Sequence, residues 1–515
     1  MTITLQRLLD AHCIERVQGD AHVALRGVHH DSRHVEAGDL FIALRGAATD
    51  GTQFVPVAIE RGAVAVLTDR DDLAASVPVA FVRDARAAFG AVAECIYGSP
   101  SHRMPVIGVT GTNGKTTTTW ILDEALTQLG AKPALLGTVE SRGPGFRAPS
   151  AFTTPEADET SRFAKRMFES GATHLVMEVS SHALTLHRVD GLRFDVAVFT
   201  NLTQDHLDFH GSMEAYFEAK AKLFTALAPR VAIIRIDDAW GEQLAARIDT
   251  SRTQCIRVSR HNHTGADVFP ASWTSTREGL TAEVVTPWGK VALRSQLIGG
   301  HNLENLLFAI ASLGAVGFHR EVNEKTQYPG DIAAALASVK GAPGRLERVP
   351  SEDDIALVVD YAHTPDALDN AINALRPLTP GRLFVVFGCG GDRDRTKRPL
   401  MGRAATRADI AILTSDNPRT EEPAAILADV EPAITEVGLA RLNPEALATA
   451  SRGFYALVDR REAIGLAVAA ARPGDTVLIA GKGHENYQIL GTTKIHFDDR
   501  EEAAQADARR PRGQR

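Results

Sequence analysis

The feature that most constrains the fold of this chain is a repeated alternation of short apolar runs with longer amphipathic stretches. Apolar runs of strand length occur at 105–109, 175–179, 196–199 and 231–236, and again at 355–359, 383–387, 410–413 and 476–480. Short, nearly continuous apolar runs are typical of strands buried on both faces, and helical stretches between them are typical of parallel sheets covered by helices. The sequence therefore predicts an α/β fold with one such sheet in the middle of the chain and another in its last third.

Two Pro- and Gly-rich passages, 97–105 and 340–344, interrupt the alternation and are expected to be linkers or tight crossings. They divide the 515 residues into predicted domains 1–103, 104–342 and 343–515, each long enough to bury its own core. The two parallel sheets fall in the central and C-terminal domains. The N-terminal domain is the one whose sequence says least about its role.

Two segments depart from the α/β rhythm. Residues 280–285 and 291–294 alternate apolar with polar side chains around a Pro-Trp-Gly turn, and this pattern predicts an antiparallel hairpin. The residues after Ala503 are mostly polar and are expected to form a frayed terminal tail.

Composition excludes several classes of protein. The net charge of -8, from 56 basic and 64 acidic residues, argues against a general nucleic-acid binder. No apolar run approaches the ~18 residues of a membrane helix, and the first residues lack the pattern of a signal peptide. The four cysteines lie far apart and form no paired motif, which fits a reducing compartment. We therefore expect a monomer in the cytoplasm that acts on small molecules without binding nucleic acid or inserting into a membrane.

The strongest chemical signal directly follows the first apolar run of the central domain. It comprises Gly111, Thr112, Asn113, Gly114, Lys115, Thr116 and Thr117. A predicted helix, 117–129, follows, so the backbone N–H groups and the helix N-terminus would cradle the phosphates of ATP. Lys115 would reach the β- and γ-phosphates, and the Thr116 hydroxyl would bind Mg²⁺. The usual motif has a glycine where Val109 stands, and the alternative is a Gly-rich turn that only enters a helix.

This loop resembles the nucleotide loop of the Mur ligases, the ATP-dependent amide-forming enzymes of peptidoglycan precursor synthesis, and that of the related folylpolyglutamate synthetases. Further motifs carry the resemblance, in order, along the whole chain: Glu178-Val-Ser-Ser-His182, Thr200-Asn-Leu-Thr-Gln-Asp-His-Leu-Asp208, His301-Asn-Leu-Glu-Asn305, Pro343-Gly-Arg-Leu-Glu347, Asp360-Tyr-Ala-His-Thr-Pro365 and Gly481-Lys-Gly-His-Glu485. The resemblance implies a UDP-sugar-binding N-terminal domain, a central P-loop ATPase domain and a Rossmann-like C-terminal domain that binds an amino acid. In detail the sequence is similar to the ligases that add the third amino acid to UDP-N-acetylmuramoyl-L-Ala-D-Glu.

Two residues are candidates for a Mg²⁺ site. Glu178 ends a predicted strand, and taken alone it is as well explained as a loop residue or a cap. His206 and His210 have the spacing of the histidines in a zinc protease, but Leu207 stands where that motif needs its general base, so this alternative fails. The resemblance places Glu178 and His206 at the metal, together with Thr116, and leaves His210 a structural role.

Lys220 would ordinarily be interpreted as a solvated helix lysine. The resemblance implies instead that it is carbamylated by CO₂, which turns it into an anionic oxygen ligand of the metal site. Lys222 is the other candidate, and alignment from the preceding Gly211-Ser-Met-Glu214 favours Lys220. With Lys115, Glu178 and His206, it completes the expected catalytic set.

The resemblance also implies contacts to ATP and to the UDP-sugar peptide. For ATP the candidates are Asn302, Asn305, Arg345 and Asp360, although either Asn is also a plausible helix cap and Arg345 is a plausible partner of Glu347. For UDP-N-acetylmuramoyl-L-Ala-D-Glu the candidates are Ser32, Thr153, Thr154, Ser180 and Arg188. Leu186 departs from the family, which has a substrate-contacting Gln at this position.

The candidate amino-acid site contains Arg393, Asp416, Asn417, Pro418, Arg419, Gly481 and Glu485. The Asp-Asn-Pro-Arg run alone is a turn signal. In the family, however, this run marks enzymes that accept meso-diaminopimelate. A guanidinium at Arg419 would pair bidentately with the distal carboxylate that diaminopimelate has and lysine lacks. Glu485 would take the distal ammonium.

The resemblance therefore implies a ligase that phosphorylates the D-Glu γ-carboxylate with ATP and transfers the acyl group to the diaminopimelate amine. Mg²⁺ and a CO₂-derived carbamate on Lys220 are the implied cofactors. Two alternatives remain at this point. A folylpolyglutamate synthetase would share the phosphate loop, and an ATP-gated binding protein would share the fold without the chemistry.

Overall fold

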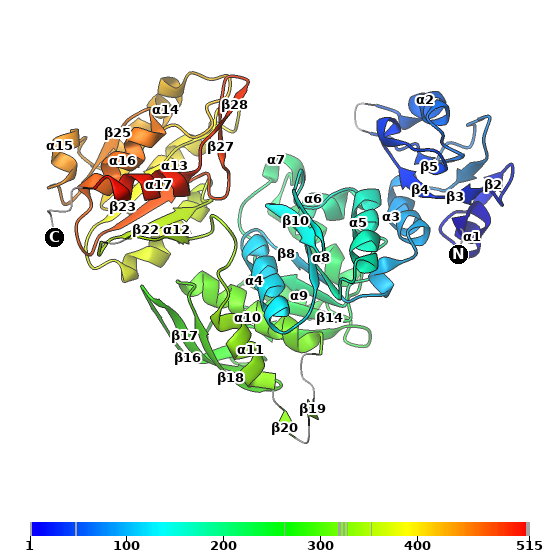
Figure 1. The fold of residues 1–515 in the computed structure, drawn as a ribbon, viewed down its shortest axis with the longest axis horizontal. Coiled ribbons are helices and arrows are strands. Elements are labelled where there is room, and N and C mark those ends of the chain that lie inside the picture. Colours follow the sequence, from blue (N-terminus) through cyan, green and yellow to red (C-terminus); the bar gives the residue numbers. More distant parts are fainter. Residues whose placement is uncertain are drawn as a thin grey trace. The chain divides into compact units, whose positions relative to one another are not determined.

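The computed structural model describes residues 3–46, 49–261, 263–317, 321–322, 325–326, 328–351 and 353–510. The chain forms two compact units, drawn in Figure 1. The first contains Met1–Trp273, Ala282–Arg294 and Glu304–Val339, and the second contains Thr274–Thr281, Ser295–Leu303 and Lys340–Arg515. The boundaries of the three predicted domains remain a prediction, since the first unit holds two sheets, each with its own core.

The N-terminal sheet is small and mostly parallel. Its strand order is β2 (Arg16–Gln18), β7 (Val79–Phe81), β6 (Ala65–Thr68), β5 (Asp39–Ile42) and β4 (Gly27–His29), with only β2 antiparallel to its neighbour. Helix α3 (Ala85–Ile96) buries Phe89 and Val92 in the core beneath this sheet. The short helix η1 (Ser32–His34) follows β4 after two residues, so the end of β4 positions Ser32.

The central sheet confirms the predicted parallel architecture. The runs predicted from the sequence are β8 (Val106–Thr110), β12 (His174–Glu178), β13 (Val196–Phe199) and β14 (Val231–Arg235). They belong to an eight-stranded sheet that is completed by β9 (Pro133–Leu136), β10 (Glu140–Gly143), β11 (Phe146–Pro149) and β15 (Gln254–Val258). Strand β8 lies between β12 and β13, all three parallel, so polar residues that follow these strands meet at one edge.

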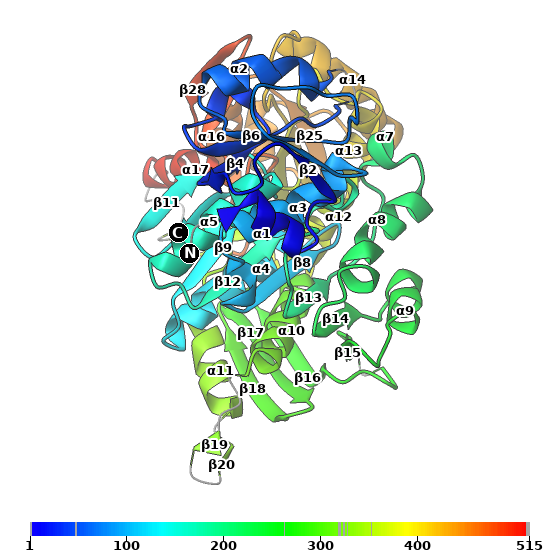
Figure 2. The ribbon, with the colours of Figure 1, turned by 90° about the vertical axis from the view of Figure 1, so that its right-hand side faces the viewer.

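Helices cover the central sheet and join it to the N-terminal one. Helix α4 (Lys115–Gln128) packs against β8, β9 and β12, and α8 (Met213–Thr225) contributes Tyr216 and Phe217 to the core. Helices α3 and α5 (Ala157–Glu169) contact each other and lie side by side in both ribbon views (Figures 1 and 2).

The C-terminal sheet has the order β21 (Glu347–Val349), β22 (Ala356–Asp360), β26 (Thr476–Ala480), β23 (Leu383–Phe387), β24 (Ile410–Leu413) and β25 (Gly453–Ala456). All neighbours are parallel except β21 and β22. Helices α12 (Pro365–Leu375), α13 (Lys397–Ala405) and α14 (Pro423–Glu436) cover one face, and α16 (Arg460–Ala470) and α17 (Asp499–Ala508) cover the other. A parallel sheet with helices on both faces is the predicted Rossmann-like arrangement.

The hairpin prediction is also confirmed as a pair of neighbouring strands. Strands β17 (Gly279–Thr286) and β18 (Gly289–Ser295) form a sheet with a third strand, β16 (Phe269–Thr276), that the sequence did not indicate. No helix in the described part of the chain is long and apolar enough to cross a membrane.

Two predicted boundaries were wrong. Helix α4 begins at Lys115 rather than at 117, because Gly114 takes a left-handed conformation (φ 87°) and lets the helix start directly after the loop. The expected frayed tail after Ala503 is instead helical as far as Ala508. Its helix is held by Asp499 and Glu502, which pair with Arg460 and Arg461 of α16.

Candidate functional site

The loop between β8 and α4 is shaped by two glycines and by the segment after β13. A Cβ on Gly111 (φ 148°) would lie 1.9 Å from Thr200 Oγ1, so no other residue fits there. The backbone N–H of Asn113 donates to Asn201 Oδ1 at 2.9 Å, and Thr200 Oγ1 donates to the Asn113 carbonyl at 2.6 Å. The loop is therefore held in one conformation at the N-terminus of a fourteen-residue helix, which is the geometry that binds phosphate.

Lys115 and Asn305 both contact this loop. Lys115 Nζ donates to the carbonyls of Gly111 and Thr112, at 2.9 Å each, so the ammonium lies over the loop. Asn305 Oδ1, on α10 (Gly300–Ala315), accepts from Thr118 Oγ1 at 3.2 Å and lies against Gly114. Asn302 differs from Asn305, because its Nδ2 donates to the Ile298 carbonyl at the start of its own helix.

Glu178 lies at the carboxyl end of β12 and is fully buried. Its Oε2 accepts from Thr116 Oγ1 at 2.9 Å, and its Oε1 accepts from the backbone N–H of Thr138 at 2.7 Å. A Cβ on Gly137 would lie 2.6 Å from Oε1. The carboxylate is thus held beside the predicted metal-binding hydroxyl of Thr116. Thr138 is a residue that sequence reasoning missed.

Aromatic rings surround His206. Its ring lies edge-on to those of His182, at 4.9 Å, and Tyr216, at 6.1 Å. Burial, together with the nearby His182 and Lys115, lowers the pKa of His206 despite the raising effect of Asp205, so the imidazole is neutral and able to bind a metal. His210 Nε2 lies 3.0 Å from Ser181 Oγ, and its ring packs on Tyr216. Burial, with smaller contributions from His182, Lys220 and His206, lowers the pKa of His210 to about 4.

Lys220 is not a solvated helix lysine. Its side chain is only 1% exposed, its Nζ donates to the Gly111 carbonyl at 2.8 Å, and it lies 4.5 Å from the Tyr216 ring centroid. Burial lowers the pKa of Lys220 well below its usual range, and Lys115 lowers it further. The alternative interpretation of Lys220, as a helix lysine that faces water, was wrong.

A cavity of about 370 Å³ opens beside these groups. Residues expected from the sequence to bind ligands supply much of its wall: Lys115, Thr153, Thr154, Ser180, Arg188, His206 and Lys220. Leu186, the departure from the family, also lines it, together with Phe152, Ser181, His182 and Tyr216, which the sequence did not single out. Ser32 is buried in the N-terminal part and is not among the lining residues.

Arg345 and Asp360 are neighbours in the second unit. The Asp360 carboxylate accepts from the backbone N–H of Leu346 at 2.7 Å, and the Arg345 guanidinium lies 4.6 Å from the ring centroid of Tyr361. Burial raises the pKa of Asp360, although the charge of Arg345 opposes this effect. Arg345 Nε is buried without a hydrogen-bond partner among the described residues, so this guanidinium retains a donor for a ligand.

The candidate amino-acid site is assembled by the loops after β23, β24 and β26. Arg419 has a left-handed backbone (φ 53°), and its Nη1 donates to the Gly391 carbonyl at 2.8 Å. A Cβ on Gly390 would lie 3.0 Å from Arg419 Nη1 and 3.6 Å from Arg393 Cγ. The two guanidinium-bearing side chains therefore meet over the Gly-rich loop, and Arg393 is exposed.

Asn417 and Glu485 form the other side of this site. Asn417 Nδ2 donates to Glu485 Oε2 at 3.0 Å, and a Cβ on Gly481 (φ 119°) would lie 3.1 Å from Asp416 Oδ2. Lys482, which the sequence analysis did not single out, is fully buried among them. Its Nζ lies 3.2 Å from Asn417 Oδ1, 3.4 Å from Glu485 Oε2 and 3.5 Å from Asp416 Oδ1.

The described residues contain no cluster of three or more His, Cys, Asp and Glu side chains suited to a metal ion. The predicted set of Thr116, Glu178, His206 and carbamylated Lys220 has only two members of those types. Its donors are oxygen atoms together with one imidazole, beside a phosphate loop, and this chemistry suits Mg²⁺, which is commonly held by a few protein ligands and phosphate oxygens.

A phosphate loop on a parallel sheet, followed by a Rossmann-like unit with its own polar loops, defines a nucleotide-dependent enzyme. Three family models match the chain in succession: the Mur ligase family catalytic domain at residues 24–105, the Mur ligase middle domain at 109–313 and the Mur ligase glutamate ligase domain at 344–483. The chain belongs to the Mur ligase family.

Similar proteins narrow the class further. The chain is 48% identical to the UDP-N-acetylmuramoyl-L-alanyl-D-glutamate–2,6-diaminopimelate ligase of Gloeobacter violaceus, over 95% of this chain and 96% of that one. A solved structure of a ligase with the same name is 34% identical, covers 99% of both chains and has a TM-score of 0.71. The folylpolyglutamate synthase of Mycobacterium tuberculosis, solved with ADP and AMPPCP, is 19% identical with a TM-score of 0.58 and covers 76% of this chain, so it shares the fold alone.

Proposed function

We propose that this chain is an ATP-dependent ligase that joins meso-diaminopimelate to the D-Glu γ-carboxylate of UDP-N-acetylmuramoyl-L-Ala-D-Glu in peptidoglycan precursor synthesis. The observation that carries the proposal is the 48% identity, over nearly the whole length, to a ligase named for these substrates. The phosphate loop at the N-terminus of α4 and the loop-built site with Arg419 and Glu485 support it, because the reaction needs both a nucleotide site and a zwitterion site.

The reaction has two chemical steps. The γ-carboxylate oxygen attacks the γ-phosphorus of ATP, the bond to the bridging oxygen breaks, and ADP leaves with an acylphosphate formed. The neutral amine of diaminopimelate then attacks the acyl carbon, loses its proton, and the tetrahedral intermediate expels phosphate. Lys115 and the backbone N–H groups of the loop stabilise the charge that develops on the transferred phosphoryl group.

Thr116, Glu178 and His206 are the residues proposed to hold Mg²⁺ in this site. Bound there, the ion would neutralise phosphate oxygens and help orient them. The 2.9 Å contact between the Thr116 hydroxyl and the Glu178 carboxylate places two hard oxygen donors together beside the phosphate loop. Thr138 positions the carboxylate by donating to it from its backbone N–H, at 2.7 Å, and from its hydroxyl, at 3.1 Å.

Lys220 is proposed to carry a carbamate. CO₂ adds only to a neutral amine, and burial, which lowers the pKa of Lys220, favours that form. The amine nitrogen forms a bond to the carbon of CO₂ and loses one proton, which leaves an anionic oxygen group. Such a group suits a site whose neighbours are Lys115 and a divalent cation.

In the second unit, Arg419 and Arg393 are proposed to bind the distal carboxylate of diaminopimelate, and Glu485 its distal ammonium. Asn417 and Lys482 fix Glu485 through Oε2. Arg345 and Asp360 are proposed to contact ATP, while Ser32, Thr153, Thr154, Ser180 and Arg188 are proposed to contact the UDP-linked peptide.

Phosphate release tests the proposal and both alternatives. We expect release from ATP only when UDP-N-acetylmuramoyl-L-Ala-D-Glu and diaminopimelate are both present, with a product heavier than the UDP-dipeptide by one diaminopimelate less water. Release with a folate and glutamate would identify a folylpolyglutamate synthetase. Binding of every substrate without release would identify a binding protein.

A further inference from the structure

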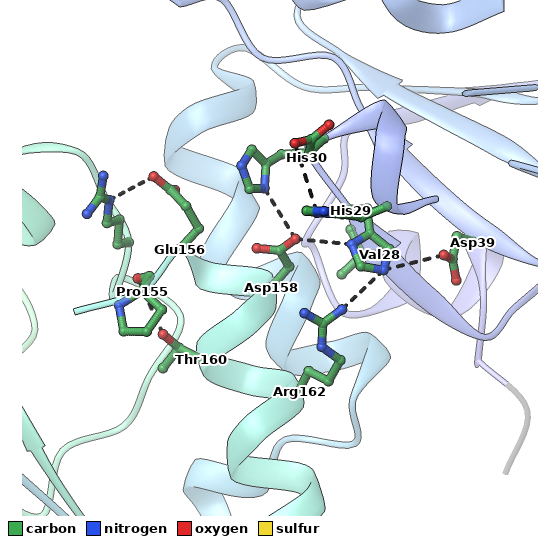
Figure 3. Close-up of polar contacts among 12 residues, drawn as sticks. Val28, His29, His30, Asp39, Pro155, Glu156, Asp158, Thr160 and Arg162 are labelled. Carbon is green, nitrogen blue, oxygen red and sulfur yellow. Dashed lines mark hydrogen bonds and ion pairs between the residues drawn. The ribbon is translucent and has the colours of Figure 1, made fainter. Parts of the chain in front are cut away.

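Two carboxylates at the start of α5 have no part in the chemistry described above, although both are mostly withdrawn from water. The side chains of Glu156, which caps the helix, and Asp158 are 13% and 1% exposed. They follow directly after Thr153 and Thr154, which line the cavity. Figure 3 shows that Asp158 points from α5 toward the N-terminal sheet, where it lies next to His29 and His30 at the end of β4.

Asp158 holds the segment that leads to Ser32. Its Oδ2 lies 3.2 Å from His30 Nδ1 and 3.6 Å from His29 Nδ1 (Figure 3). The other ring nitrogen of His29, Nε2, lies 3.1 Å from Arg162 Nη1 and 3.6 Å from Asp39 Oδ2, so both nitrogens of this imidazole have polar neighbours. Both histidines are thereby fixed to one carboxylate, two residues before Ser32.

Glu156 contacts Arg188, a residue of the cavity wall. Its carboxylate takes a bidentate contact from Arg86 of α3, at 2.6 Å and 3.2 Å, and its Oε1 also lies 2.8 Å from Arg188 Nε. Arg188 Nη1 donates to the Thr154 carbonyl at 3.2 Å. The contact between Arg188 Nε and Glu156 Oε1 is an ion pair without hydrogen-bond geometry, so this ion pair and the hydrogen bond to Thr154 together hold the guanidinium of a residue that lines the cavity.

We propose that Glu156 and Asp158 are positioning residues for the UDP-linked substrate, an inference that rests on the proposed function. Asp158 fixes the 29–32 segment, where the uridine end would bind, and Glu156 orients Arg188, where the dipeptide end would bind. Because a single residue, Ala157, separates the two carboxylates in the chain, they hold the two ends of one ligand site at a set separation. Holding ligand-binding groups in place before the ligand arrives reduces the entropy lost on binding.

The two carboxylates have separable effects, and this separation distinguishes positioning from general stability. Asp158→Asn removes the carboxylate partner of His30 and one of the two carboxylates beside His29, the other being Asp39, and should weaken binding of UDP and of the UDP-dipeptide alike. Glu156→Gln should weaken binding of the UDP-dipeptide and leave UDP within about twofold of wild type. The expected loss is on the order of tenfold to a hundredfold, the usual range for a hydrogen bond to a charged group.

The matched control is Glu159→Gln, which removes the same charge one residue further along α5, away from these contacts. Calorimetric titration with UDP and with UDP-N-acetylmuramoyl-L-Ala-D-Glu measures the effect, and the KM values for ATP and diaminopimelate should not change. Arg86→Gln acts on Glu156 from α3 and should reproduce the selective loss, so the test survives if Glu156→Gln does not fold.

Equal losses of UDP and UDP-dipeptide affinity in Glu156→Gln and Arg86→Gln, or none beyond the control, would overturn the inference. A wild-type protein that fails to bind the UDP-dipeptide would instead overturn the proposed function. The two failures are therefore distinguishable in one set of titrations.

Discussion

The phosphate and metal region of the first unit differs from the amino-acid region of the second in how each is held. Glu178 and Lys220 are 0% and 1% exposed, and each is bonded to backbone at the edge of one sheet. In the second unit, Arg393 is exposed and Arg419 is half-buried on a left-handed residue of a loop. The groups proposed for phosphoryl transfer therefore lie against the sheet framework, whereas those proposed to select the amino acid lie on loops, which can vary without disturbing that framework.

The second region nevertheless has a rigid base. Lys482 is fully buried beneath the loops, next to Asp416, Asn417 and Glu485. Arg460 is also fully buried, and it pairs with Asp499 while its Nη2 donates to the Ala480 carbonyl at 2.9 Å. Two fully buried side chains, Lys482 and Arg460, thus support the loop that begins at Gly481.

The largest expected effect is on the buried site of the first unit. Lys220→Ala should lower ligation about a thousandfold or more, because it removes the proposed anionic ligand at the centre of charge development. Lys222→Ala, two residues away on the same helix, is the matched control and should stay near wild type. High bicarbonate with a short carboxylic acid such as acetate should restore part of the lost activity of Lys220→Ala, since the added carboxylate can occupy the space of the carbamate.

Substantial ligation by Lys220→Ala in the absence of bicarbonate and acetate would contradict the proposed role of this buried residue. The same conclusion would follow from electron density that shows an unmodified amine at Lys220 beside bound Mg²⁺ and nucleotide. Both results would mean that burial of this lysine serves only the fold.

A large loss of stability is expected at the base of the second region. Arg460→Met leaves Asp499 as a buried carboxylate without its cation and should lower the free energy of unfolding by about 3–5 kcal/mol. Arg461→Gln, at the neighbouring pair in which the arginine is exposed and Glu502 is buried, should cost less than Arg460→Met. Urea unfolding of the full chain, with hydrogen exchange in α16, measures both. Equal costs for the two variants would show that the loops do not rest on the buried pair.

The smallest expected effect concerns pH and the contact between the N-terminal and central sheets. Burial tends to lower the pKa of His30, but the hydrogen bond and charge of Asp158 outweigh it, with a further contribution from Glu156 against the opposing charge of Arg86, and raise the pKa. The stabilisation is therefore fully present below the unfolded pKa of about 6.5 and is lost as the pH rises through the folded value.

His30→Gln should thus destabilise the protein at pH 6 by about 1 kcal/mol or less, and the difference from wild type should shrink toward pH 8.5. Thermal unfolding of both proteins across this range checks the sign. A difference that grows with pH would contradict a protonated His30 beside Asp158.

Much of this architecture was predictable because strands that are buried on both faces appear in the sequence as short apolar runs. The runs at β8, β12, β23 and β26 are mostly apolar, and a motif whose residue types match a ligand lies at or after the end of each run. The parallel pairing of β8 and β12 brings the phosphate loop beside Glu178, and Lys115 and Lys220 both line the cavity.

The residues that were missed act through backbone atoms or through distant partners. Thr138 binds Glu178 with its backbone N–H, which any residue except proline carries, and its position after β9 has no motif. Glu156 stands beside the Thr153-Thr154 pair, yet its partner Arg86 lies 70 residues away. Lys482 lies inside the Gly481-Lys-Gly-His-Glu485 motif, but the presence of a lysine there does not indicate that its side chain is buried. Long-range packing decides such roles, and one sequence does not reveal it.

The central claim is that the loops of the second unit select diaminopimelate by its distal carboxylate. The measurement that tests it most directly is kcat/KM for meso-diaminopimelate and for lysine in wild type, Arg419→Ala and Arg419→Lys. Wild type should prefer diaminopimelate by roughly 10⁴-fold, because lysine leaves the guanidinium groups of this site without the carboxylate with which they would pair. Arg419→Ala should lose about 2–5 kcal/mol of transition-state stabilisation for diaminopimelate and far less for lysine. Arg419→Lys should not restore the preference, since an ammonium lacks the planar fork. A ratio that Arg419→Ala leaves unchanged would contradict the account and reduce the Asp-Asn-Pro-Arg run to a turn.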